Sequence, residues 1–214
     1  MNISKNILII ANGKFPRISV IKDILSLNPS IVCCDGAAEK AYRNNINPDV
    51  IIGDMDSINS NLNSKFSNKI IKIDNQDTND LSKALSWLNQ RDVDSVTIIG
   101  ADGIREDHSL GNIFVLLENK YKYKISMINE FGRFDLMDGD KQLFQSFKDQ
   151  PVSIFCLDKN IKLNSKGLRY PLNDFSFSKL YDASLNASTG EYFEISCNKE
   201  SINLLVYRAN EETR

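Results

Sequence analysis

The first 130 residues alternate short, wholly apolar runs with segments in which apolar residues recur at helical spacing. The apolar runs predict strands at 6–10, 30–35, 49–54, 69–74, 95–100 and 123–129. The periodic segments predict helices at 19–27, 37–45, 78–90 and 107–120. A strand that is apolar throughout is buried on both faces, and a helix between consecutive strands usually connects parallel ones. The alternation therefore predicts a parallel sheet with helices on both faces.

The pattern changes near residues 130–134. Beyond them, turn residues at short intervals separate the apolar runs 134–139, 141–146, 152–157, 191–196 and 202–207. Closely spaced strands of this kind are typical of an antiparallel sandwich. We therefore expect an α/β domain over residues 1–131 and an antiparallel β-sandwich domain over residues 132–214.

The composition argues against several classes of protein. The formal net charge is −2 and the basic residues are scattered among acids, whereas a nucleic-acid binder usually carries a basic stripe. No apolar stretch has the length of a membrane span or the features of a secretory signal. The cysteines lack a CxxC or zinc spacing and suit free thiols in a reducing cytosol; they are Cys33, Cys34, Cys156 and Cys197. We expect a cytoplasmic protein that binds neither nucleic acid nor membrane.

The stretch "DVIIGDMDSIN" (49–59) ends an apolar run in two aspartates, Asp54 and Asp56. Residues i and i+2 of an extended segment project to the same side, so both carboxylates would face one point. Two carboxylates held so close repel each other unless a cation or a proton lies between them. Mg²⁺ suits the pair, since it takes one or two carboxylates and keeps sites for phosphate oxygens. An Asp-rich turn that caps the next segment explains the same residues, and both interpretations stay open at this point.

Acids and glycines also follow the other expected strands. In an open parallel sheet, ligands bind beyond the carboxyl ends of the strands, so these residues would share one edge. They include Asn12, Gly13, Asp35, Gly36, Gly53, Asp74, Gly100, Asp102 and Gly103. Their recurrence at five strand ends predicts a binding site at that edge.

The segment "NQDTNDLSKAL" (75–85) begins an expected helix. Asp77 is placed to cap it by accepting backbone N–H bonds. Asp80 would lie in the first turn, where the helix dipole favours an anion, or would act as a third metal ligand. Lys83, one turn further on, would either reach a phosphate or be solvated.

The segment "GADGIREDHSLGN" (100–112) begins another helix after a glycine turn. Arg105 is suited to bidentate contact with phosphate oxygens. Asp107 is either the N-cap of the helix or a contact to a substrate, and we expect a structural role for His108, the single histidine. The P-loop, dinucleotide-binding and nucleophile-elbow motifs are all absent from the sequence, which leaves phosphate handling by acids, a metal and an arginine.

Three segments in this order and spacing resemble the thiamine pyrophosphokinase family: "CDGAAEKAYRNNINPDVIIGDMDSI", "NQDTNDLSKAL" and "GADGIREDHSLGNI". A weaker resemblance, in "GLRYPL" and "ASLNAST", is to the thiamine-contacting β-domain of the same family. One departure is Asn79, which stands where the family usually has a threonine before the metal-binding aspartate. The resemblance covers most of the first 130 residues.

The resemblance implies transfer of a pyrophosphoryl group from ATP to the hydroxyl of thiamine, with release of AMP. It implies an α/β nucleotide-binding domain with a β-sandwich, working as a homodimer whose active sites lie at the subunit interface. Asp54, Asp56 and Asp80 would hold Mg²⁺ against the triphosphate, and Arg105 would contact phosphate. The residues expected to line the substrate sites are Asp35, Gly36, Asn79, Lys83 and Asp107, together with Ser184 or Asn186 from the β-domain.

Two other functions would use the same acidic edge. A metal-dependent phosphohydrolase would cleave a nucleotide without thiamine. A non-catalytic nucleotide or thiamine sensor would bind without turnover, although it has no need for a complete set of metal and phosphate residues.

Overall fold

A computed structural model describes residues 3–56, 64–199 and 202–211, in two compact units. Unit 1 comprises Met1–Val115 and Tyr121–Glu130, and unit 2 comprises Leu116–Lys120 and Phe131–Arg214. Within those described ranges, the helices are all too short or too polar to cross a membrane.

Unit 1 is built on a sheet in which every neighbouring pair of strands is parallel. Its order is β4-β3-β2-β1-β5-β6. The strands are β1 (Asn6–Ile10), β2 (Ser30–Cys34), β3 (Val50–Gly53), β4 (Ile70–Lys72), β5 (Ser95–Ile99) and β6 (Lys124–Ile128). The expected parallel sheet is therefore confirmed. Because β1 has β2 on one side and β5 on the other, the chain leaves β1 in one direction and later returns to its opposite edge.

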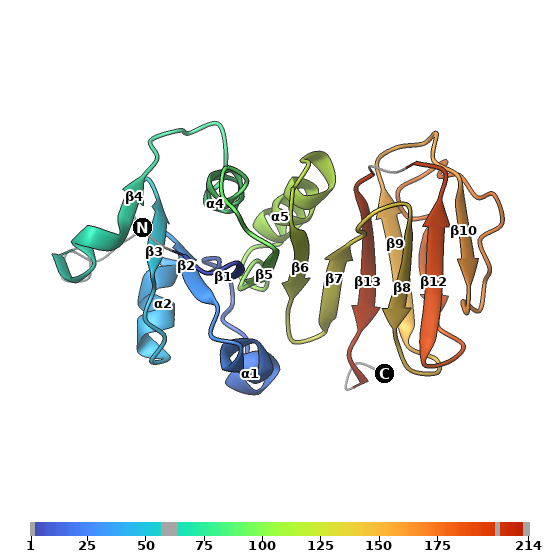
Figure 1. Cartoon of the computed structure of the whole chain (residues 1–214), viewed down its shortest axis with the longest axis horizontal. Helices are drawn as coiled ribbons and strands as arrows, with labels where there is room; N and C mark the ends of the chain where they lie inside the picture. The colour runs from blue at the N-terminus through green and yellow to red at the C-terminus, as the bar shows by residue number, and fades with distance from the viewer. Residues whose placement is uncertain (1–2, 57–63, 200–201, 212–214) are drawn as a thin grey trace. The chain divides into compact units, whose positions relative to one another are not determined.

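Helices cover both faces of this sheet, with α1 and α2 on one face and α4 and α5 on the other (Figure 1). Their bounds are α1 (Ile18–Ser26), α2 (Ala37–Arg43), α4 (Asp80–Leu88) and α5 (Glu106–Glu118), and a 3-10 turn, η1, spans Ser67–Lys69. Leu8, Ile10 and Cys33 pack in one buried cluster with residues of α1 and α2. Since side chains alternate along a strand, their neighbours point to the opposite face, where α4 lies against β2 and β3.

Unit 2 consists of two antiparallel sheets that share one core. One sheet has the order β11-β9-β13-β7, and its strands are β7 (Gly132–Leu136), β9 (Pro151–Cys156), β11 (Ala183–Ala187) and β13 (Leu204–Ala209). The other has the order β10-β12-β8, and its strands are β8 (Lys141–Gln145), β10 (Leu163–Lys166) and β12 (Tyr192–Cys197). Ile154 and Val206 of the first sheet pack in one cluster with Phe144 and Phe193 of the second. This arrangement confirms the expected antiparallel sandwich.

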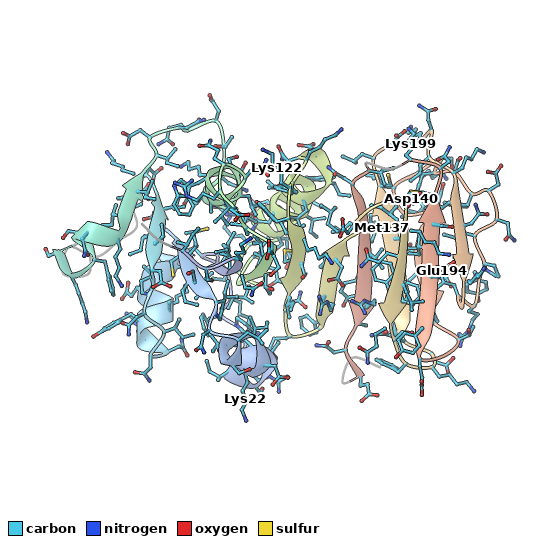
Figure 2. All side chains as sticks on the ribbon, viewed as in Figure 1. Lys22, Lys122, Met137, Asp140, Glu194 and Lys199 are labelled. Atoms are coloured by element: carbon cyan, nitrogen blue, oxygen red, sulfur yellow. The ribbon has the colours of Figure 1, made fainter. Side chains whose placement is uncertain are left out.

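Strands β8 and β12 of unit 2 are joined by an ion pair in addition to their shared core. Figure 2 labels Glu194 on β12, which forms an ion pair of 3.0 Å with Lys141 of β8. It also labels Met137, a buried residue that follows β7 and belongs to the core cluster. Lys199, after β12, forms an ion pair with Asp158 (Figure 2).

Candidate functional site

A pocket of about 410 Å³ lies at the edge of unit 1 where the strands of the parallel sheet end. Residues after β1, β3 and β5 line it, among them Asn12, Asp54 and Asp102. The first residues of α4 and α5 complete the wall. The strand order reverses here, since β1 is followed along the chain by β2 on one side and β5 by β6 on the other, and open α/β sheets bind ligands beyond the carboxyl ends of the strands at such a point.

Three carboxylates meet in this region. Oxygens of Asp35, Asp54 and Asp56 all lie within 4.8 Å of one another. Asp35 directly follows β2, lies in the left-handed region at φ 39°, and is only 2% exposed. Its amide donates to the carbonyl of Ile52 at 2.9 Å, and a Cβ on Gly53 would lie 2.8 Å from the Cβ of Asp35. The absence of a side chain at Gly53 therefore lets Asp35 approach the end of β3.

Asp54 and Asp56 converge through a turn. Met55 between them has φ 69°, so this segment is a turn and not the extended segment expected from the sequence. The amide of Asp56 donates to Oδ1 of Asp54 at 3.5 Å, as in an Asx turn. The expectation that both carboxylates face one point is thus met by a different backbone geometry. The turn is therefore present, and it leaves the carboxylates close enough together for a cation to bind.

Lys83 connects Asp80 to this acidic group. Its side chain is 4% exposed, and Nζ lies 2.9 Å from Oδ1 of Asp80 and 3.8 Å from Oδ2 of Asp54. The suggestion of a solvated lysine is therefore wrong. Burial works against the charge of Lys83, but the hydrogen bond from its ammonium to Asp80 and the nearby carboxylates raise its pKa. Asp80 itself lies outside the group of three carboxylates.

The carboxylate of Asp54 is kept ionised by its neighbours. Burial disfavours its charge, but the Asp56 amide, the Lys83 ammonium and the Gln76 side chain together hold the pKa of Asp54 below its usual value. Gln76 contributes a hydrogen bond of 3.2 Å from Nε2 to Oδ2. An ionised carboxylate is the form that binds a cation.

The start of α4 is capped by Asn79, whose Oδ1 accepts from the amide of Ser82 at 2.8 Å. The expectation that Asp77 caps this helix is wrong, since the helix begins at Asp80 and the amide of Asp77 donates to Asn75. Nδ2 of Asn79 donates to Oδ1 of Asn112 at 3.0 Å. Asn112 in turn donates to the carbonyl of Ala101 at 2.7 Å, so amide side chains join three walls of the pocket.

Arg105 and Asp107 form an exposed ion pair at the start of α5. Nη2 of Arg105 lies 2.5 Å from Oδ2 of Asp107, and the two side chains are 63% and 62% exposed. The hydrogen bond from Arg105 lowers the pKa of Asp107. Asp107 lies in the first turn of α5, which begins at Glu106, so it is not the N-cap. Arg105 lines the pocket together with His108.

The remaining expected residues lie in α2 and unit 2. Gly36 is buried and is the N-cap residue of α2. On β11, Oγ of Ser184 donates to the carbonyl of Tyr181 at 2.7 Å. Asn186 is 6% exposed and bonds both backbone groups of Tyr170, at 3.0 and 2.8 Å. The side chain of Asn186 thus holds the Tyr170 backbone against β11.

Gln76 and Asn112 also line the pocket, and no sequence pattern indicated a role for them. Both lie within the segments that carry the family resemblance, next to residues that were singled out. An uncharged amide has many surface uses, so position alone did not distinguish them. The hydrogen bonds from Gln76 to Asp54 and from Asn112 to Ala101 identify them as part of the site.

The three clustered carboxylates fit a hard divalent cation. Carboxylate oxygens are the protein ligands that Mg²⁺ prefers, and it commonly takes only one or two while binding phosphate oxygens as well. The nearby charges of Asp35, Asp54 and Asp56 would repel one another without a cation. Lys83 supplies one positive charge beside Asp54, so most of the negative charge of the three carboxylates remains for a bound cation to neutralise.

The fold and the pocket define an open-sheet α/β protein with an acidic site at the carboxyl edge of its strands. Two family models match this chain: "Thiamin pyrophosphokinase, catalytic domain" over residues 21–128 and "Thiamin pyrophosphokinase, substrate-binding domain" over residues 132–207. The chain therefore belongs to the thiamine pyrophosphokinase family. The family resemblance noted in the sequence is confirmed.

Individual relatives agree with this assignment. The chain is 31% identical over 163 residues to thiamine pyrophosphokinase 1 of Oryza sativa subsp. japonica, which covers 64% of this chain and 57% of the relative. It is 30% identical over 102 residues to thiamine pyrophosphokinase of Bacillus subtilis (strain 168), which covers 46% of this chain and 48% of the relative. The chain thus spans about half the length of the curated relatives it matches.

Solved structures show the same fold. The crystal structure of thiamine pyrophosphokinase from Bacillus subtilis superposes with a TM-score of 0.78 at 22% identity, and covers 96% of this chain and 99% of that one. Thiamin pyrophosphokinase from Candida albicans superposes with a TM-score of 0.77 at 21% identity, and covers 96% of this chain and 89% of that one.

Proposed function

We propose that this chain transfers a pyrophosphoryl group from Mg²⁺-bound ATP to the hydroxyl of thiamine, giving thiamine diphosphate and AMP. The observation that carries the proposal is the acidic pocket, most of whose lining residues lie within the match to the family's catalytic domain. In this reaction the thiamine oxygen bonds to the β-phosphorus of ATP. The bond from that phosphorus to the oxygen it shares with the α-phosphorus breaks, and the hydroxyl proton is released.

We assign Asp54, Asp56 and Asp80 to the binding of Mg²⁺, with Asp35 adding a carboxylate at the same point. When bound, Mg²⁺ neutralises charge that develops on the phosphate oxygens. The contribution of the chain is to keep Asp54 ionised through the ammonium of Lys83 and other donors, and to bring the carboxylates of Asp35, Asp54 and Asp56 together through the turn at Met55. Asp80 is supported by its position beside Lys83, which links it to Asp54.

Arg105 would bind the phosphate oxygens in a bidentate manner. Its ion pair with Asp107 is exposed, so water already surrounds both groups and exchange of Asp107 for a phosphate costs little desolvation. Asp107, released from Arg105, would contact substrate. Asn79 would position the start of α4 at the substrate. Lys83 would balance the negative charge of Asp54 and Asp80.

The two parts of the chain would bind different substrates. Residues 1–131 would bind ATP, and residues 132–214 would bind thiamine through Ser184 or Asn186. We also propose a homodimer with its active sites at the subunit interface. The free thiols of Cys33, Cys34, Cys156 and Cys197 support a reducing compartment such as the cytoplasm.

The direct test is AMP formation from Mg-ATP with and without thiamine. We expect AMP to appear only when thiamine is present, together with thiamine diphosphate. Nucleotide cleavage at the same rate without thiamine would support a hydrolase instead. Binding of ATP or thiamine without any turnover would support a sensor.

The metal assignment is tested on Asp54→Asn and Asp80→Asn, with Asp74→Asn as the control. Asp74 is an exposed acid after β4 that pairs with Lys72 at 2.8 Å and does not line the pocket. We expect turnover to fall by about a hundredfold or more in the first two variants, because each removes a charge that holds the cation. Mg²⁺ affinity, measured by calorimetry, should fall in parallel. If Asp80→Asn binds Mg²⁺ like the wild type, Asp80 is not a metal ligand.

A further inference from the structure

Lys40, on α2, holds the loop that follows β1. Its ammonium donates to two main-chain carbonyls, that of Asn12 at 2.6 Å and that of Gly13 at 2.7 Å. Both of these residues line the pocket, whereas Lys40 does not. A hydrogen bond from a charged donor is stronger than one between neutral groups. Lys40 therefore restrains the pocket wall from outside.

The same loop is restrained on its other side by the loop that follows β5. The amide of Gly13 donates to the carbonyl of Gly100 at 2.6 Å, and the amide of Lys14 donates to that of Asp102 at 2.7 Å. A Cβ on Gly13 would lie 2.4 Å from the oxygens of both acceptor residues, so the two backbones are in direct contact. Residues 12–14 are thus held between Lys40 and residues 100–102, just before Arg105.

The charged ammonium of Lys40 interacts with backbone carbonyl groups. Burial lowers its pKa, and within residues 3–56, 64–199 and 202–211 no acidic neighbour offsets that effect. Carbonyl dipoles satisfy the ammonium without cancelling its charge. A positive charge therefore remains behind the wall of a pocket that, on the proposed function, receives an anionic nucleotide.

We propose that Lys40 is a positioning residue for the nucleotide: it holds residues 12–14 against residues 100–102 and so sets the shape of the pocket wall. The identity of the ligand rests on the proposed function, whereas the restraint on the loop is a property of the free protein. Loss of the ammonium leaves two carbonyls without their donor and loosens the loop. It removes none of the groups assigned to the metal or to the phosphate.

The restraint is tested first without any ligand. Lys40→Met keeps most of the side-chain length and removes the donors, and Lys40→Arg keeps a cationic donor. The control is Lys22→Met, because Lys22 is an exposed lysine on α1 in the same unit (Figure 2). We expect amide exchange of Gly13 and Lys14 to accelerate about tenfold in Lys40→Met and to change less than about twofold in Lys22→Met. Unchanged exchange in folded Lys40→Met would overturn the proposal.

The effect on the nucleotide is tested by steady-state kinetics with thiamine in excess. We expect the KM for Mg-ATP to rise about tenfold in Lys40→Met while kcat falls less than about threefold, and Lys40→Arg to recover most of the loss. A lysine with a purely structural role would lower the melting temperature and leave this KM unchanged, which would contradict the proposal.

Failure of the proposed function gives a different result. In that case the wild-type protein forms no AMP with thiamine, whatever residue stands at position 40. The affinity for ATP is then measured by calorimetry on wild type and Lys40→Met, and this affinity is compared in place of the KM. A weaker affinity in the variant supports the proposal and an equal affinity overturns it.

Discussion

Gly53 and Asp35 illustrate how one missing side chain sets the spacing of the acidic group. Asp35 is buried in a left-handed conformation, and its Cβ occupies the space that a side chain on Gly53 would need. The carboxylates of Asp54 and Asp56 then lie close enough to Asp35 to share a cation. These positions depend on contacts between residues on neighbouring strands.

We predict that Gly53→Ala is destabilised by about 1–3 kcal/mol, because Cβ would lie 2.8 Å from the Cβ of Asp35 and one strand end must shift. AMP formation should fall as well, since the shift moves a carboxylate of the site. The control is Gly111→Ala in α5, where Cβ meets nothing within 4 Å and alanine should stabilise the helix by about 0.5–1 kcal/mol. Urea unfolding measures both changes, and equal stability of the two variants would refute the steric argument.

At the scale of elements, apolar periodicity predicted strands β1 to β6 of unit 1 and the helices α1, α2, α4 and α5, with bounds correct to within a few residues. Two strands of unit 2 were missed. β10 reads LNSK and has a single apolar residue, and β11 changes register between Ala183 and Asn186, with Leu185 at φ 59°. A polar edge strand and a bulged strand have no regular alternation, because partner strands rather than their own side chains stabilise them.

The cap of α4 gives a second prediction. Asn79→Ala should lower the free energy of unfolding by about 1 kcal/mol, because the amide of Ser82 loses its acceptor. Asn79→Asp keeps an acceptor at the cap and should retain most of this stability, although it cannot donate to Asn112. Chemical denaturation of the three proteins measures the difference. An Asn79→Asp variant as unstable as Asn79→Ala would show that the bond to Asn112, and not the cap, is the main contribution.

The turn before β11 predicts a dependence of stability on pH. The carboxylate of Asp182 accepts from the hydroxyl and amide of Ser178, at 2.7 and 2.9 Å, and from the amide of Lys179 at 2.8 Å. The hydroxyl of Ser178 contributes most to holding the pKa of Asp182 below its usual value. A carboxyl whose pKa is lowered by folding stabilises the protein above the pKa of the unfolded chain, about 3.9, and loses that effect as the pH falls through the folded value.

Asp182→Asn should therefore be less stable than the wild type at pH 7, and the gap should narrow below about pH 4. Urea midpoints at several pH values measure the gap. Asp140→Asn, at an exposed turn before β8 (Figure 2), is the control and should stay close to the wild type throughout. A gap for Asp182→Asn that is constant from pH 7 to pH 3 would contradict the prediction.

At the scale of the whole molecule, the proposed homodimer would place β11 at the interface between two subunits. Ser184 and Asn186 on this strand are the residues proposed to meet thiamine, and Leu185 between them is 87% exposed. An active site at a subunit interface would cover this leucine. Covering it would remove its apolar surface from water, which favours association.

We expect light scattering to give twice the mass of one chain, and Leu185→Asp to shift the mass towards one chain, because a buried interface does not accept an unpaired charge. Leu27→Asp, at the end of α1, is the control, since Leu27 is 72% exposed and lies in unit 1. A wild-type mass of one chain at micromolar concentration would refute the dimer. An unchanged mass in Leu185→Asp would place the interface elsewhere.

The sequence by itself determined the order of the elements and the change from α/β to antiparallel β, because apolar periodicity is a local property that neighbouring residues carry together. It also indicated an acidic edge, since the strand ends of a parallel sheet meet there. Only the tertiary structure decided that Lys83 is buried beside Asp80, that Asp35 joins Asp54 and Asp56, and that Lys40 holds residues 12–14. These features depend on contacts between residues far apart in the sequence and on the exclusion of water from them. A local sequence pattern predicts neither.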